Sequence, residues 1–108
     1  MITENIIKEV TMRLKEAAPR ATIILFGSHA RGDAGEASDL DILVVEKEVK
    51  ARRLEMVRLS DVIRPLGVPA DILVTSRKVF EEWKDIPGTV IYKAAKEGKI
   101  LYEEQEKY

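Results

Sequence analysis

Apolar side chains recur every three or four residues in four stretches of the chain, the spacing that gathers them on one face of an α-helix. Pro19 closes the first stretch and Gly67 ends the second, as expected for helix boundaries. Ser76 can cap a third helix that points Val79, Phe80 and Trp83 inward. The predicted helices cover residues 3–18, 50–66, the segment after Ser76, and 90–97.

Short runs rich in aliphatic and β-branched residues separate these stretches and predict strands. The runs are residues 21–26, 40–45 and 71–74, with a small edge strand at 100–102. Gly27 breaks the first run, and a short helix can begin at Ser28. The order is therefore αβαβαβαα(β), which predicts an α/β (α+β) fold with one small mixed sheet. A chain of 108 residues is long enough for one domain, residues 1–108.

Composition narrows the functional classes. The net charge is −1, with 18 basic and 19 acidic residues, which gives no basic surface for general nucleic-acid or membrane binding. No apolar run approaches the ~20 residues of a membrane span, and the N-terminal residues are polar and amphipathic, without the apolar run of a signal peptide, so we expect a cytoplasmic protein. Abundant charge, 34%, with few amides is typical of a thermophilic source.

The chain has no cysteine and one histidine, His29. Thiolate sites and sites with several histidines are thereby excluded. A bound metal would be held by carboxylate oxygens, which favours Mg²⁺ or Mn²⁺.

Three aspartates stand at the starts of two predicted strands. Asp39 and Asp41 are two residues apart and so project to one face of a strand, about 7 Å apart along the backbone. Asp71 begins the next strand, and the strings LDILV (40–44) and ADILV (70–74) are near copies. If these strands are parallel neighbours, the three carboxylates meet. Such carboxylates around two metal ions suit in-line attack at phosphorus.

Gly27 and Ser28 follow the first strand and precede the short helix, where free backbone N–H groups attract phosphate. For this turn to meet the aspartates, the first strand must run antiparallel to the other two. Taken singly, each feature has a structural explanation: a turn, a solvated strand start, or surface side chains at His29 and Arg31. Only their joint occurrence predicts a nucleotide site.

The segment GSHARGDAGEASDLDILV (27–44) resembles the hallmark of the polymerase-beta-type nucleotidyltransferase superfamily. Within that superfamily, its sequence is similar to the same segment of the minimal nucleotidyltransferase (MNT) proteins of prokaryotes. The resemblance covers nearly the whole chain. It implies that Asp39 and Asp41 bind two Mg²⁺ (or Mn²⁺) ions and that Asp71 binds the metal at the attacking hydroxyl. Gly27 and Ser28 would hold the triphosphate. Arg31 and Ser38 complete the expected nucleotide-binding set.

Members of this family commonly pair with a small helical HEPN-type toxin, and some transfer AMP to a tyrosine of that toxin. The resemblance therefore implies a metal-dependent nucleotidyltransferase, a protein adenylyltransferase using ATP, with an antitoxin role. Larger relatives carry a further domain that completes the acceptor site, so we expect a partner protein or a second copy here. The alternatives are a non-catalytic nucleotide-binding antitoxin that acts by steric occlusion and, less favoured by the short chain, an antibiotic adenylyltransferase. Base preference, acceptor and oligomeric state stay open.

Overall fold

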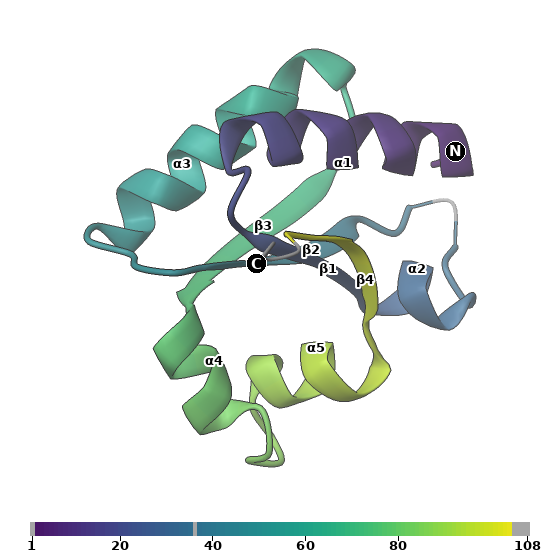
Figure 1. Ribbon diagram of the computed structural model, residues 1–108. Helices are drawn as coiled ribbons and strands as arrows, with labels where there is room; N and C mark the ends of the chain where they lie inside the picture. Colours follow the sequence, from purple (N-terminus) through teal and green to yellow (C-terminus); the bar gives the residue numbers. More distant parts are fainter. Residues whose placement is uncertain (1, 36, 105–108) are drawn as a thin grey trace.

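The computed structural model describes residues 2–35 and 37–104 (Figure 1). Its elements follow the predicted order, and the predicted fold class is confirmed. They are α1 (Glu4–Ala17), β1 (Thr22–Phe26), α2 (Ser28–Arg31), β2 (Leu40–Glu46), α3 (Arg52–Ile63), the 3-10 helix η1 (Arg64–Leu66), β3 (Ala70–Ser76), α4 (Arg77–Trp83), α5 (Val90–Glu97) and β4 (Lys99–Glu103).

The four strands form one mixed sheet in the order β3-β2-β1-β4. Strands β2 and β3 are parallel, and α3 provides the connection between them. Strand β1 runs antiparallel to both of its neighbours, β2 and β4. This is the strand arrangement that the carboxylates and the Gly-Ser turn require.

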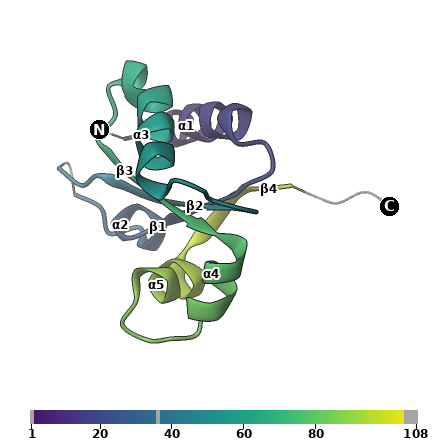
Figure 2. The same ribbon diagram turned by 90° about the vertical axis from the view of Figure 1, so that its left-hand side faces the viewer.

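Helices cover both faces of the sheet: α1 and α3 lie on one side, and α4 and α5 on the other (Figure 2). Successive strand residues point to opposite faces, so β2 supplies both cores. Ile42 and Val44 pack with the α1 and α3 side, whereas Leu43 and Val45 pack with Phe80 of α4 on the other side. The near-continuous apolar run of β2 follows from this double burial.

The second long helix ends earlier than predicted. Helix α3 stops at Ile63, and η1 carries the chain to Gly67, whose φ is 65°. Pro65 lies at the start of η1; proline has no N–H to donate and disfavours α-helical backbone in the residue before it. The α-helix therefore gives way to a 3-10 turn before the glycine that was predicted to end it.

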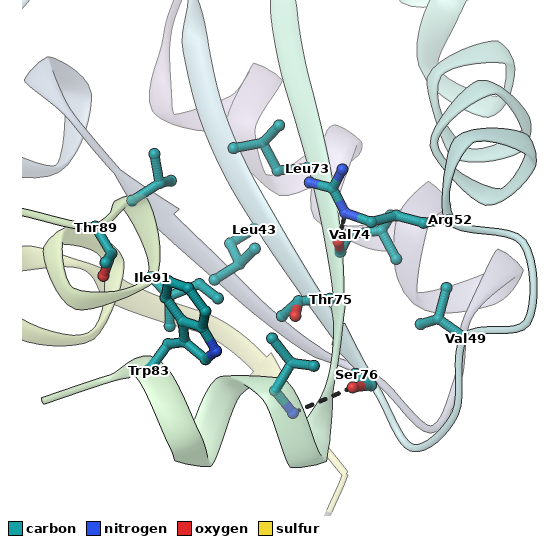
Figure 3. Close-up of a pocket in the computed structure, with 12 residues that line it drawn as sticks. Leu43, Val49, Arg52, Leu73, Val74, Thr75, Ser76, Trp83, Thr89 and Ile91 are labelled. Carbon is teal, nitrogen blue, oxygen red and sulfur yellow. Dashed lines mark hydrogen bonds between the residues drawn. The ribbon is translucent and has the colours of Figure 1, made fainter. Parts of the chain in front are cut away.

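The short helix α4 corrects another expectation. Phe80 is buried as predicted, but Val79 is 38% exposed and Trp83 is 45% exposed. Helix α4 has only seven residues, and only the middle of its apolar stripe reaches the sheet. Its flanks instead face an open space between the sheet, α4 and α5 (Figure 3). Within the described residues, no helix is long and apolar enough to cross a membrane.

Candidate active site at the strand starts

The starts of β2 and β3 bring two aspartates from distant parts of the sequence into register. Asp41 is the second residue of β2 and Asp71 the second residue of β3, and the two are direct partners in the parallel pair. Asp39 immediately precedes β2. On the other side of β2, Asp41 stands opposite Phe26, the last residue of β1. The sheet therefore places the Gly27 turn, Asp41 and Asp71 side by side across three strands.

The charges of these groups act on one another. Burial raises the pKa of Asp41 above its ordinary value, and the neighbouring carboxylates of Asp71 and Asp39 raise this pKa further. Asp41 is half-buried, whereas Asp39 and Asp71 are exposed. A low-dielectric setting strengthens the repulsion among like charges. The cluster thus favours a cation or a proton at its centre.

Gly27 is the point of closest approach between the turn and the carboxylates. Its φ is 74°, in the region that favours glycine. A Cβ atom built at this position would collide with Oδ2 of Asp41. The backbone of the turn therefore lies directly against the Asp41 side chain, and only glycine satisfies both the backbone angle and the contact.

Helix α2 begins at Ser28 directly after this glycine. It is a single turn of four residues, so its dipole is small. Any attraction for a phosphate would therefore come from its backbone N–H groups. The first N–H groups of any helix have no intrahelical partner. At Ser28 such groups follow directly on Gly27, whose backbone lies against the Asp41 side chain.

The loop before Asp39 is fastened to α2 by hydrogen bonds. Nε2 of His29 donates to the carbonyl oxygen of Ser38 over 3.1 Å, which requires the proton on Nε2 because a carbonyl can only accept. The Ser38 hydroxyl accepts a hydrogen bond from the N–H of Gly35 over 3.0 Å. Ser38, predicted to bind nucleotide, thus orders the loop; its contact with a nucleotide stays a prediction.

Arg31, also predicted to bind nucleotide, is engaged by two carboxylates. Its guanidinium contacts Asp33 at 3.2 Å and Glu97 of α5 at 3.1 Å. Exposed pairs of this kind contribute little stability, about 0–1 kcal/mol, so a phosphate can compete for the guanidinium. The structure places Arg31 between α2 and α5, and its role in nucleotide binding stays a prediction.

Sequence reasoning missed one basic residue, Lys93 of α5. Together with His29, its positive charge favours the ionised form of Asp41 and opposes the rise of that pKa. The side chain of Thr89 caps α5 by accepting a hydrogen bond from the N–H of Tyr92 over 3.0 Å, and Ala94 packs with Phe26 and Leu43 beneath the helix. Only tertiary packing brings Lys93 near the site, so no local sequence motif predicts its role.

The donor set fits a hard divalent cation. In residues 2–35 and 37–104, no three His, Cys, Asp or Glu side chains are already arranged to hold a metal ion. The carboxylates of Asp39, Asp41 and Asp71 nevertheless supply oxygen donors, which Mg²⁺ prefers, and Mg²⁺ commonly takes only one or two carboxylates with phosphate and water. The mutual repulsion at Asp41 is the energy that such a cation would relieve.

Comparison with known proteins gives the same family over most of the chain. Residues 7–105 match the family described as Nucleotidyltransferase domain. A candidate protein adenylyltransferase of Methanocaldococcus jannaschii is 34% identical over 104 residues, which cover 94% of this chain and 100% of the relative. A second candidate protein adenylyltransferase of that organism is 35% identical over 68 residues, which are 63% of this chain and 66% of the relative.

Solved structures share the fold. A candidate nucleotidyltransferase of Sulfolobus solfataricus superposes with a TM-score of 0.63 at 25% identity, covering 90% of this chain and 77% of that one. A toxin–antitoxin complex crystallised with AMP-PNP gives a TM-score of 0.62 at 20% identity, covering 91% and 74%. A complex of an MNT antitoxin with the tri-AMPylated HEPN toxin of Shewanella oneidensis gives 0.58 at 17% identity, covering 94% and 74%. The family predicted from the Gly-Ser and Asp-x-Asp pattern is confirmed: the chain belongs to the nucleotidyltransferase domain family.

Proposed function

We propose that this protein transfers a nucleoside monophosphate, AMP from ATP, to a hydroxyl group. One observation carries the proposal: the register of the sheet sets Asp41 opposite Asp71 and directly against Gly27. A phosphate-binding turn and paired carboxylates then face one α-phosphorus atom from two sides. Membership of the family supports the same chemistry.

The proposal gives each of these residues a role. Gly27 and Ser28 hold the β- and γ-phosphates through backbone N–H groups and the serine hydroxyl. Asp39 and Asp41 would hold the two Mg²⁺ ions against the triphosphate. Asp71 would help to hold the ion on the side of the incoming hydroxyl. When bound, the ions neutralise phosphate charge and lower the pKa of the hydroxyl.

The reaction balances without any further reactant. The hydroxyl oxygen forms a bond to the α-phosphorus while the bond from that phosphorus to the bridging oxygen of the β-phosphate breaks. Pyrophosphate leaves over Gly27 and Ser28. The hydroxyl proton passes to Asp71, the carboxylate on the attacking side, or through it to water.

The acceptor in this proposal is a tyrosine of a small helical HEPN-type partner, for which this chain is the antitoxin. Support comes from fold neighbours in toxin–antitoxin complexes, one crystallised with AMP-PNP and one an MNT antitoxin with an AMPylated HEPN toxin, and from relatives described as candidate protein adenylyltransferases. The net charge of −1 offers no basic groove to a nucleic-acid acceptor. A protein acceptor brings its own binding surface, and the resulting orientation is worth up to ~7–11 kcal/mol of barrier.

The test is intact-mass spectrometry of the HEPN-type partner after incubation with this protein, Mg²⁺ and ATP. We expect a mass increment of one or more AMP groups with the wild type and none with Asp41→Asn. Asp61→Asn on the remote helix α3 is the matched control and should transfer normally. A tight complex with no increment under any nucleoside triphosphate would overturn the enzymatic proposal and leave steric occlusion as the antitoxin mechanism.

The role of Asp71 is tested in the same assay by separating binding from transfer. Because Asp71 lies on the attacking side, Asp71→Asn should keep most of the affinity for Mg²⁺ and ATP while transfer falls steeply. Isothermal titration gives the affinity, and the rate of mass increase gives the transfer. Equal loss of both would reassign Asp71 to the triphosphate.

A further inference from the structure

A hollow lies between the sheet and helices α4 and α5 (Figure 3). Its volume is about 520 Å³, within the range of roughly 300–1,000 Å³ typical of ligand pockets. Leu43 and Leu73 form its floor on the sheet, Ile91 lines it from α5, and Trp83 and Val79 line it from α4. Trp83 is directed into this space rather than away from it (Figure 3).

The hollow lies on the same face of the sheet as the carboxylates of Asp41 and Asp71. Leu43 is two residues beyond Asp41 in β2, and Leu73 is two residues beyond Asp71 in β3. Side chains two apart on a strand share a face and are separated by about 7 Å. The floor residues Leu43 and Leu73 therefore occupy the next positions on that face, further along β2 and β3 than the two carboxylates.

The geometry of phosphoryl transfer assigns a direction to each part of the substrate. The leaving pyrophosphate lies over Gly27 at the end of β1, and the incoming hydroxyl lies over Asp71 on the edge strand β3. With β2 between them, the axis of in-line displacement runs across the strands. The nucleoside is a further substituent of the α-phosphorus and must leave that axis. On this face, the course along β2 and β3 leads into the hollow.

We propose that this hollow is the nucleoside subsite and that Trp83 is its stacking wall; the inference rests on the proposed function. This assignment explains why three apolar side chains are exposed: Trp83 (45%), Val79 (38%) and Val90 (49%). A bound base and ribose would cover them. Stacking on an aromatic ring tolerates any base. The hydroxyl of Thr75 and the guanidinium of Arg52, which also line the hollow, supply polar contacts to the base edge.

Arg52 is held in place for such a contact. Its Nε donates a hydrogen bond to the carbonyl oxygen of Val74 over 2.7 Å, which ties α3 to the open edge of β3. The guanidinium has further N–H donors beyond Nε, and the same anchoring fixes their direction. Ser76 and Thr89 on the rim serve instead as helix caps.

Trp83 is the only tryptophan of the chain, so fluorescence excited selectively at tryptophan, outside the tyrosine absorption band, reports on this subsite alone. We expect ATP with Mg²⁺, and AMP at higher concentration, to change the emission of Trp83. Inorganic tripolyphosphate should compete with ATP without changing the emission. A wild-type protein that binds ATP with unaltered emission would overturn the inference.

Two variants test the subsite by titration calorimetry. Trp83→Ala removes the wall and Val79→Phe fills the space, and each should raise the Kd for ATP about tenfold, within the range for base stacking, while leaving the Kd for tripolyphosphate unchanged. Ile86→Ala, an equally exposed apolar neighbour (46%) outside the lining, is the control and should bind both normally.

The outcomes separate the inference from the proposed function. If both variants bind ATP like the wild type while Asp39→Asn with Asp41→Asn abolishes binding, the subsite is overturned and the reaction stands. If those variants lose affinity only for the HEPN-type partner, the hollow is a protein-docking site and the inference is wrong. If the wild type binds neither ATP nor tripolyphosphate, the proposed function falls and the subsite falls with it.

Discussion

At the scale of single residues, Asp41 is the most constrained group in the site. Its pKa is raised by burial and by the charges of Asp71 and Asp39, while Gly27 closes one side of its carboxylate. A side chain that repels its neighbours contributes to function rather than to stability. A bound cation would offset the cost of gathering these charges, as the proposed function requires.

Metal-linked stability follows from this repulsion. A ligand that binds only the native state adds RT ln(1 + [L]/Kd), about 2.7 kcal/mol at a hundredfold excess over Kd, so Mg²⁺ with ATP should raise the Tm. The double variant Asp39→Asn with Asp41→Asn should lose this rise, while its Tm without ligand equals or exceeds that of the wild type. Differential scanning fluorimetry measures both. A full ligand-induced rise in the double variant would remove these residues from the metal site.

The Gly27 turn permits a second prediction at this scale. Ser28→Ala removes one hydrogen bond to a charged phosphate and should cost about 1.5–3 kcal/mol of ATP binding. Gly27→Val should do more damage, because its side chain meets the Asp41 carboxylate as well as the path of the triphosphate. Gly32→Ala is the control: it also has a positive φ, 82°, but a Cβ there meets no atom within 4 Å. Normal ATP binding by Gly27→Val would refute the phosphate turn.

At the scale of elements, an acidic cluster joins the far end of β2 to α3. Arg58 donates two hydrogen bonds to Glu55, at 2.7 and 2.8 Å, and a third to the carbonyl of Ala17 at 3.0 Å. Glu46 lies against Glu55, and its buried Oε2 has no hydrogen-bond partner among the residues that the structure describes. A proton on Glu46 resolves this, because the acid then donates to the Glu55 carboxylate. Burial and the contact with Glu55 accordingly raise the pKa of Glu46 to about 7.

The raised pKa of Glu46 makes the folding stability depend on pH. Between the ordinary glutamate pKa of 4.5 and about 7, the folded protein binds more protons at Glu46 than the unfolded chain, so stability falls as the pH rises through this window. Arg58 holds the pKa of Glu55 at about 2, so the stability contributed by Glu55 is lost only as the pH falls from 4.5 toward that value.

The variant Glu46→Gln tests this cluster. An amide donates to Glu55 at every pH, so the variant should lack the loss of stability between pH 5 and 8 and be more stable than the wild type at pH 8, by on the order of 1–2 kcal/mol. Urea unfolding at pH 5 and pH 8 gives the difference. The control is Glu48→Gln, in an exposed neighbouring residue, which should retain the wild-type slope. Equal slopes for Glu46→Gln and the wild type would contradict the shared proton.

At the scale of the whole molecule, the sequence predicts the features that local patterns encode. The copied strings LDILV and ADILV correspond to parallel strands with Asp41 and Asp71 in register, and the spacing of apolar residues gives the helices to within a few positions. Features created by packing were not predictable. Trp83 has the helical spacing of a core residue, yet α4 is too short to bring its whole apolar stripe to the sheet, and Trp83 is 45% exposed. The raised pKa of Glu46 likewise depends on burial and on the contact with Glu55 of another element.

Lys93 is the clearest case of a residue that only the assembled fold explains, and it gives the last prediction. Because α5 packs against β1 and β2 through Ala94, the charge of Lys93 acts on Asp41 and favours the ionised carboxylate, which opposes the rise of its pKa. A lysine beside phosphate-binding residues is placed to pair with the triphosphate, and a charge-assisted hydrogen bond is worth about 1.5–3 kcal/mol. Lys93→Ala should therefore raise the Kd for both ATP and tripolyphosphate at least tenfold. Lys78→Ala, on the exposed face of α4, is the matched control. If calorimetry gives both variants the wild-type affinity, Lys93 serves only to balance the charge of Asp41, and the triphosphate is held by the Gly27 turn and the metal alone.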